Sequence, residues 1–303
     1  MKRQLIFLPI IFAALILAGC GGGNTNTTSS GVFLGGTEGL KVSFEPIGVV
    51  ENGVQTIYDS EHFPLELILK NKGEETIPIG KVSLRLLGPP QNDFQNIPQW
   101  TINNKAEILK VSEFNPEGGE EVVSFTSSNL ARYTKAVTGF TDINWNVEYA
   151  YEYKTHVIIN DVCFKGDITD DKICEPKGTR TFAVSAAPIQ VTGVEEDTAG
   201  KGVPVLKINL RNSGTGDSTI VGEEFDTRFS QVGYAVDEPQ LWECKSGGRE
   251  NVARFVDGAT QVICKLKNPL REDELYTKTI GFTVNYKYKE LVQEKLRVKE
   301  SVE

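Results

Sequence analysis

The chain has 303 residues, of which 39% are hydrophobic and 24% are charged, and its formal net charge is −9. This length predicts about two domains, and the apolar fraction excludes a wholly disordered chain. The acidic balance argues against nucleic-acid binding, which needs clustered lysine and arginine, and the presence of only two histidines argues against most histidine-based catalysis and metal chemistry.

The N-terminus has the pattern of a secretory signal. Two basic residues precede an apolar run over residues 5–18. That run is shorter than the roughly 20 residues that span a bilayer, so it fits the core of a signal peptide. The sequence Leu17-Ala18-Gly19-Cys20 resembles a lipobox, which implies lipid on the Cys20 thiol and cleavage just before it. We predict a lipoprotein signal peptide over residues 1–19; an ordinary signal peptide or a short anchor helix is the alternative.

Residues 20–37 are rich in Gly, Asn, Thr and Ser and cannot build a core. We predict that they form a flexible tether that holds the folded part off the membrane. Cleavage removes Lys2 and Arg3 and changes the net charge from −9 to −11. So acidic a chain does not favour docking on anionic headgroups, and the lipid must supply the membrane attachment. Asn26 begins the only N-glycosylation sequon, with an unmodified spacer as the alternative.

Alternating apolar and polar residues dominate from Lys41 onward and predict β-strands. Two such segments, over residues 63–71 and 203–212, each end in an Asn-x-Gly turn that begins at Asn71 or Asn212. Further on, the pattern Val-x-Tyr-x-Tyr starts at Val147 and again at Val284. The distance from the turn to this pattern is 76 positions in the first case and 72 in the second. Two matched signatures at nearly equal spacing predict a duplicated domain.

Short strands with polar turns predict an all-β fold with two tandem immunoglobulin-like β-sandwiches after the signal peptide and tether. We place domain 1 at residues 38–187, with a loop insertion near residues 88–119, and domain 2 at residues 188–303. Helix signals are few. Residues 97–112 and 223–229 could each hold one short helix.

The segment Val203 to Gly214 resembles the strand and Asn-x-Gly turn of immunoglobulin-like domains of the CARDB type. Such domains occur in tandem on archaeal and bacterial surface proteins. The lipobox with its Thr- and Asn-rich tether is similar to that of archaeal surface lipoproteins. The resemblance implies a structural or adhesive role, and it brings no shared catalytic residues.

The five cysteines separate into one lipidation site and four that can pair. Of the three possible pairings, Cys163 with Cys174 and Cys244 with Cys264 needs the shortest loops and no domain crossing. Two disulfides fit an oxidising, extracytoplasmic location. Zinc is disfavoured, because the chain has no C-x-x-C pair and its two histidines, at positions 62 and 156, are far apart.

Five acidic residues surround the first cysteine pair, and oxygen-rich loops of this kind bind Ca²⁺. They are Asp161, Asp167, Asp170, Asp171 and Glu175. EF-hand spacing is absent, and a solvated hairpin tip closed by a disulfide is the favoured alternative. The aromatic stripe Trp145, Tyr149, Tyr151 and Tyr153 could stack on sugars, but a strand that faces the core is favoured.

No known catalytic motif occurs in the chain, and no cofactor is predicted. We therefore predict a non-enzymatic, lipid-anchored module of the cell envelope that has a structural, protein-binding or adhesive role. Its partners would be the membrane, through Cys20, and an envelope protein or glycan. The alternatives are a surface carbohydrate-binding protein or carboxylate-dependent hydrolase, because the 41 acidic residues offer many pairs, and a solute-binding lipoprotein.

Overall fold

The computed structural model describes residues 31–169 and 173–301. Within these ranges the chain forms β-strands and one short 3₁₀ helix, Gln91–Asp93, and no α-helix. The predicted all-β class is thus confirmed. The two expected helices are wrong: strand β8 (Thr101–Asn103) lies inside the first segment, and residues 223–229 are irregular. Neither segment has the 3.6-residue apolar period that would bury one face of a helix.

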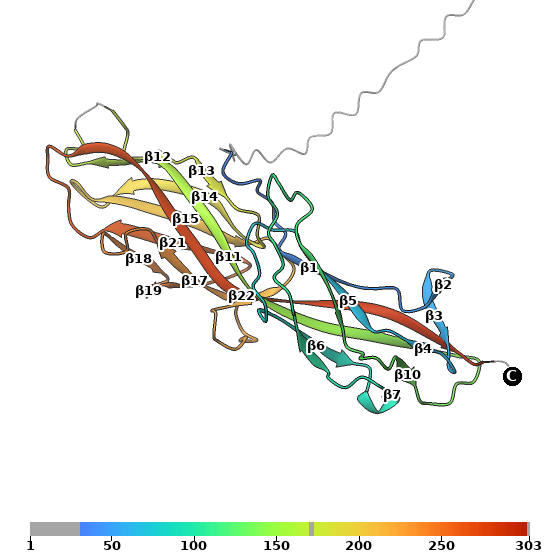
Figure 1. Cartoon of the computed structure of the whole chain (residues 1–303). Helices are drawn as coiled ribbons and strands as arrows, with labels where there is room; N and C mark the ends of the chain where they lie inside the picture. The colour runs from blue at the N-terminus through green and yellow to red at the C-terminus, as the bar shows by residue number, and fades with distance from the viewer. Residues whose placement is uncertain (1–30, 170–172, 302–303) are drawn as a thin grey trace, which may run out of the picture.

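Two unusually long strands form the spine of the molecule. Strand β11 (Phe140–Lys165) pairs with strand β22 (Leu275–Lys299) in an antiparallel ladder that runs from Phe140 opposite Lys299 to Lys165 opposite Leu275. Figure 1 shows this green and red pair extending through the whole length of the molecule. Alternate side chains are buried along nearly all of β11, so the period-2 pattern predicted for this region extends over 26 residues.

The spine lies at the centre of a ten-stranded sheet with the main order β2-β3-β22-β11-β6-β8. One end of this sheet is formed by β2 (Val49–Glu51), β3 (Val54–Tyr58) and β6 (Val82–Gly88). Strand β3 runs parallel to β22, whereas the spine and the remaining pairs are antiparallel. The other end is formed by β13 (Phe182–Val184), β16 (Asp217–Thr219), β17 (Gln231–Val236) and β20 (Val252–Arg254).

A second layer covers one end of the central sheet and completes what we call the N-terminal lobe. It is the antiparallel sheet β1 (Leu40–Phe44), β5 (Glu66–Asn71) and β9 (Glu120–Ser124). A small sheet of β4 (His62–Phe63), β10 (Ala131–Tyr133) and β7 (Phe94–Gln95) lies beside it. Leu65, Leu67 and Leu69 are fully buried, as the alternation predicted, and Phe63 packs its ring edge against Trp145 on the spine.

A six-stranded sheet covers the other end and completes the C-terminal lobe. Its order is β12 (Gly178–Thr179), β14 (Ile189–Thr198), β15 (Pro204–Asn212), β21 (Ala259–Leu266), β18 (Trp242–Ser246) and β19 (Arg249–Glu250). Leu206, Ile208 and Leu210 on β15 are buried, again in agreement with the predicted alternation. The sheet packs on the second part of β11 and the first part of β22 (Figure 1).

The two lobes share one central sheet and one continuous hydrophobic core. Strand β22 lies in the predicted domain 2 but supplies residues 290–299 to the N-terminal lobe, while β11 supplies residues 154–165 to the C-terminal lobe. Two separate tandem sandwiches are therefore not confirmed, and the limits 38–187 and 188–303 stay predictions. The sequence pattern could not show this exchange, because alternation marks a strand without naming its partner.

Candidate functional site at the junction of the lobes

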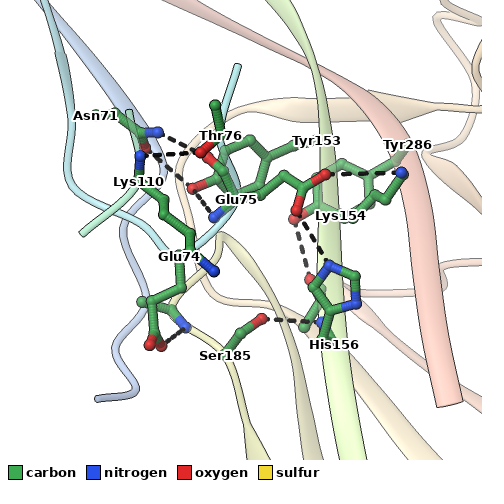
Figure 2. Close-up of polar contacts among 12 residues, drawn as sticks. Asn71, Glu74, Glu75, Thr76, Lys110, Tyr153, Lys154, His156, Ser185 and Tyr286 are labelled. Atoms are coloured by element: carbon green, nitrogen blue, oxygen red, sulfur yellow. Dashed lines mark hydrogen bonds and ion pairs between the residues drawn. The ribbon is translucent and has the colours of Figure 1, made fainter. Parts of the chain in front are cut away.

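The turn after β5 fixes the N-terminal lobe to the spine. Asn71 is fully buried, and its Oδ1 accepts hydrogen bonds from the Gly73 N–H at 3.1 Å and the Tyr153 hydroxyl at 3.0 Å. Its Nδ2 donates to the Glu75 carbonyl at 2.7 Å, and the Glu75 N–H donates to the Tyr153 hydroxyl at 3.2 Å. One asparagine thus satisfies the turn and, at the same time, binds a tyrosine on β11 (Figure 2).

The turn after β15 repeats this arrangement in the C-terminal lobe. Asn212 Oδ1 accepts from the Gly214 N–H at 3.2 Å and the Tyr288 hydroxyl at 2.9 Å. Asn212 Nδ2 donates to the Gly216 carbonyl at 2.7 Å, and the Gly216 N–H donates to the Tyr288 hydroxyl at 2.9 Å. The same four hydrogen bonds at matching positions support the predicted duplication.

The glycine of each turn is required by the tyrosine beside it. A Cβ atom at Gly73 would lie 2.1 Å from the Tyr153 hydroxyl oxygen, and one at Gly214 would lie 2.4 Å from that of Tyr288. The contacts also correct the alignment of the two copies. The repeated Val-x-Tyr-x-Tyr pattern matches Tyr288 with Tyr151, whereas the hydrogen bonds match it with Tyr153, so the sequence alignment of the aromatic strands is offset by two residues.

Four tyrosines of the spine meet where the two lobes join. Tyr151 lies opposite Tyr288 and Tyr153 lies opposite Tyr286, with ring centroids 5.9 and 6.4 Å apart. Burial raises the pKa of all four phenols above the ordinary value of 10.0. They therefore stay neutral over the ordinary pH range. The hydroxyl groups of Tyr153, Tyr286 and Tyr288 form hydrogen bonds in the core, whereas the buried Tyr151 hydroxyl has no partner among the described residues. The core interpretation of the aromatic stripe is confirmed, because Trp145, Tyr149, Tyr151 and Tyr153 are all buried.

The half-exposed polar group at this junction consists of Glu75, Lys154 and His156 (Figure 2). Glu75 Oε2 lies 3.1 Å from His156 Nε2, and Glu75 Oε1 lies 3.7 Å from Lys154 Nζ. Strand β6 leaves β11 at Tyr151, and β13 joins it only at Val157. The turn that contains Glu75 therefore sits beside a short stretch of β11 that has no strand partner on that side.

Glu74, the neighbouring residue, connects three parts of the chain. It is 8% exposed, and its carboxylate accepts hydrogen bonds from the backbone N–H groups of Leu34 at 2.9 Å, Gly35 at 3.0 Å and Ala186 at 2.7 Å. Ala186 belongs to the connection between β13 and β14. Glu74 thus holds the last residues of the predicted tether, 31–37, against the connection between the lobes.

This group lacks the geometry of an acyl-transfer centre. The Ser185 hydroxyl accepts a hydrogen bond from the backbone N–H of His156 at 2.9 Å and does not contact the imidazole ring. In the described part of the chain, the ring has Glu75 as its hydrogen-bond partner and no serine or cysteine beside it. A nucleophile needs a base within hydrogen-bond reach. The contacts of Glu75 with His156 and Lys154 connect the turn after β5 to strand β11.

Both predicted disulfides are present. Cys163, near the end of β11, is bonded to Cys174 in the following loop, and their Cα atoms are 5.8 Å apart. Cys244 and Cys264 are bonded across directly opposite positions of β18 and β21. Beside the first bridge, the Glu196 carboxylate is buried, accepts the Cys163 N–H and forms an ion pair with Arg180 at 2.5 Å. Burial raises the pKa of Glu196, and the hydrogen bonds from Cys163 and Arg180 oppose that rise.

The acidic residues proposed for calcium are only partly visible. Asp170 and Asp171 lie outside the described residues. The Asp167 carboxylate accepts hydrogen bonds from the Thr169 N–H and hydroxyl at 3.0 and 2.8 Å, which lowers the pKa of Asp167. Across residues 31–169 and 173–301, three or more His, Cys, Asp or Glu side chains nowhere gather in a group that could hold a metal ion.

Cys20, Asn26 and the signal peptide over residues 1–19 also lie outside the described residues. Within the described ranges, no helix has the length and hydrophobicity needed to span a membrane.

No protein-family model matches the chain, and no curated protein matches it either. The functional argument therefore rests on the sequence and on the structure of this chain. Sequence reasoning identified both asparagine turns but missed Glu74 and Glu75. The available signal was the pair of carboxylates directly after the turn glycine, a position where the second copy has Thr215 and Gly216.

Proposed function

We propose that the chain is a lipid-anchored, extracytoplasmic module of the cell envelope with a structural or binding role and no enzymatic activity. The observation that carries this proposal is the spine. Because β11 and β22 run through both lobes in one ladder, the lobes form one elongated body. Such a body suits a spacer or scaffold better than a hinged pair of domains that closes around a substrate.

Two further features support this placement. Two disulfides are typical of proteins outside the reducing cytoplasm. The lipobox and its polar tether fit attachment through Cys20. We further propose that each lobe is an immunoglobulin-like sandwich of the CARDB kind, in which one strand of each lobe extends into the other.

Lipidation can be tested by expressing the full chain in cells fed an alkyne-tagged fatty acid. The wild-type protein is expected to carry the label, to sediment with membranes and to be cut by protease added to intact cells. Cys20→Ala should lose the label and the membrane association. Cys163→Ala changes another cysteine and should keep the label. Labelling of Cys20→Ala would contradict the assignment of Cys20.

The binding role can be tested by cross-linking on intact envelopes, followed by pull-down of the full chain. Envelope proteins or glycans are expected among the captured partners. Recovery of soluble cytoplasmic partners alone would refute the proposed location and role together.

A further inference from the structure

The C-terminal lobe has an open hollow on its surface, which we call the cavity, with a concentration of arginine. Its volume is about 410 Å³, and it lies between the connection over residues 220–230 and the edge formed by β17, β19 and β20. This volume is within the range of about 300–1,000 Å³ that small-molecule sites occupy. Three arginines line it, although the whole chain has few: they are Arg228, Arg249 and Arg254.

In the part of the chain that the structure describes, two of these guanidinium groups have no carboxylate within ion-pair distance. Arg249 and Arg254 form no ion pair with any carboxylate of the described residues. Arg254 instead stacks over the Phe229 ring, with its guanidinium carbon 3.7 Å from the ring centroid. Stacking fixes the plane of a guanidinium while leaving the N–H groups at its edge free to bind a ligand.

The third arginine is held in place differently. Arg228 Nε donates to Asp226 Oδ1 at 3.0 Å, and its Nη2 donates to Asp226 Oδ2 at 2.7 Å. The hydrogen bond from this side chain is the main cause that lowers the pKa of Asp226 to about 2. Asp226 therefore stays ionised and pairs with Arg228, and its charge also acts on Arg254. Arg249 and Arg254 are thus the two lining arginines whose guanidinium groups have no carboxylate of the described chain within ion-pair distance.

The remaining lining narrows the ligand class. Glu223 and Glu224 also line the cavity, and a Glu223 carboxylate oxygen accepts a hydrogen bond from Gln231 Nε2 at 2.9 Å. These carboxylates would repel a multiply charged anion but can accept hydrogen bonds from hydroxyl groups. Phe229, Ile220 and Val252 add apolar surface. The lining of the cavity thus combines two arginines that can bind a carboxylate, acceptors for hydroxyl groups and apolar surface for C–H groups.

We propose that this cavity binds an acidic sugar, with the carboxylate of a uronic acid unit on Arg249 and Arg254 and its hydroxyl groups facing Glu223 and Glu224. An envelope glycan is a polymer that can supply such a unit. The inference extends the proposed binding role by naming the ligand class. It requires neither the lipid nor a particular location, so it can fail while lipidation of Cys20 holds, and the reverse.

The test is a titration of the full chain, purified in detergent, with D-glucuronate by calorimetry. Glucose and inorganic phosphate serve as probes that lack the carboxylate or the sugar. D-glucuronate is expected to bind at least about tenfold more tightly than either, because bidentate arginine–carboxylate pairs are strong and specific. Arg254→Ala should weaken binding about tenfold or more, and Arg254→Lys should not restore it, because lysine lacks the planar fork.

Arg271→Ala is the matched control, because it removes the same charge from an exposed arginine outside the cavity. Thermal melts of each variant check that it is folded. No binding of D-glucuronate, equal binding by folded Arg254→Ala, or equal binding of glucose or phosphate would each overturn the proposal.

Discussion

The two lobes hold the spine with the same turn but surround that turn differently. In the N-terminal lobe Asn71 is fully buried, and its Nδ2 also lies 3.3 Å from the Ile108 carbonyl. In the C-terminal lobe Asn212 is half-buried and has no such second acceptor among the described residues. Glu75 in the first turn corresponds to Gly216 in the second, since both N–H groups bind the matching tyrosine. The two lobes thus share the asparagine, glycine and tyrosine that hold the spine, whereas the residues of the turns that face solvent differ.

The connections after the turns differ more strongly. In the N-terminal lobe only residues 78–81 separate Ile77 from β6, but in the C-terminal lobe residues 221–230 separate Ile220 from β17. The longer connection places Phe225 under Lys287 and Lys289 and Phe229 under Arg254. Binding residues are commonly placed on loops that a rigid framework positions. The two lobes thus share the turns that hold the spine, whereas the proposed binding site lies beside the connection over residues 221–230, which the N-terminal lobe lacks.

The largest expected effect comes from separating the lobes. A fragment of residues 31–187 keeps β11 but lacks β22, so the strand that pairs with β11 over its whole length is absent. We expect this fragment not to fold cooperatively, because it exposes a long strand edge and a row of core side chains. Circular dichroism melts and amide NMR spectra measure this directly.

The matched control for this fragment is the chain over residues 31–301, which contains both long strands. It should melt in one cooperative transition. A fragment of residues 31–187 that melts cooperatively with dispersed NMR signals would contradict the shared spine and would favour two independent domains.

The next largest effect is unfolding at alkaline pH, caused by ionisation of the buried tyrosines. Burial raises the pKa of Tyr153 and Tyr288 above the ordinary value of 10.0, and it raises the pKa of Tyr234 to about 12. A phenol with a raised folded pKa stabilises the fold fully below the unfolded pKa, and this stability is lost as pH rises through the folded pKa. We therefore expect cooperative unfolding above about pH 10, accompanied by phenolate absorbance.

A pH titration that follows phenolate absorbance and far-UV circular dichroism together checks this expectation. Most of the nine tyrosines should ionise only as the secondary structure is lost. Full ionisation near pH 10 with unchanged circular dichroism would show that the junction admits water.

The asparagine turns allow a direct comparison of the lobes. Asn71→Ala should lower the free energy of unfolding by about 3 kcal/mol and Asn212→Ala by about 2 kcal/mol, because each unsatisfied buried group costs about 1–3 kcal/mol. The difference arises from the deeper burial of Asn71. Urea denaturation measures both values, and Asn129→Ala at an exposed position is the control. Equal losses would show that burial does not distinguish the turns.

Much of the core and both disulfides could be predicted from the sequence. Alternation predicted that Leu65, Leu67 and Leu69 share one face of a strand, which the structure buries, and loop length predicted the two disulfides. These features depend on residues that are close in sequence. The aromatic stripe could likewise be assigned to the core, because a strand that begins with tryptophan suits a buried sheet face.

The rest depends on contacts between distant residues. Tyr149, Tyr151 and Tyr153 all obey the same period of two, so the pattern cannot tell which one matches Tyr288; the contact with Asn71, 82 positions away, decides it. Glu75 and His156 are 81 positions apart and have no motif in common. The exchange of β22 between the lobes is a matter of pairing, which a single sequence does not encode locally.

A smaller effect is expected from the tyrosine hydroxyls. Tyr153→Phe and Tyr288→Phe each remove one hydroxyl and leave the ring, so each should cost about 1–2 kcal/mol, as for the loss of a buried hydrogen bond. Tyr153 should cost more, since its hydroxyl binds the fully buried Asn71, whereas that of Tyr288 binds the half-buried Asn212. Tyr276→Phe at a partly exposed ring is the control. If Tyr288→Phe lowers the free energy of unfolding more than Tyr153→Phe does, then the turn of the C-terminal lobe depends more on its tyrosine than that of the N-terminal lobe, which contradicts this expectation.

The smallest expected effect concerns the carboxylate that only the N-terminal copy has. Glu75→Gln keeps the size of the side chain but removes the charge that faces His156 and Lys154. Because these side chains are partly exposed, the loss should be at most about 1 kcal/mol. Glu152→Gln is the matched control: Glu152 lies on β11, as Lys154 and His156 do, and the substitution breaks its ion pair with Lys81. If Glu75→Gln instead costs as much as Asn71→Ala, then the Glu75 carboxylate is one of the groups that hold the spine. The C-terminal lobe would then have to gain the same stability from contacts outside its own turn.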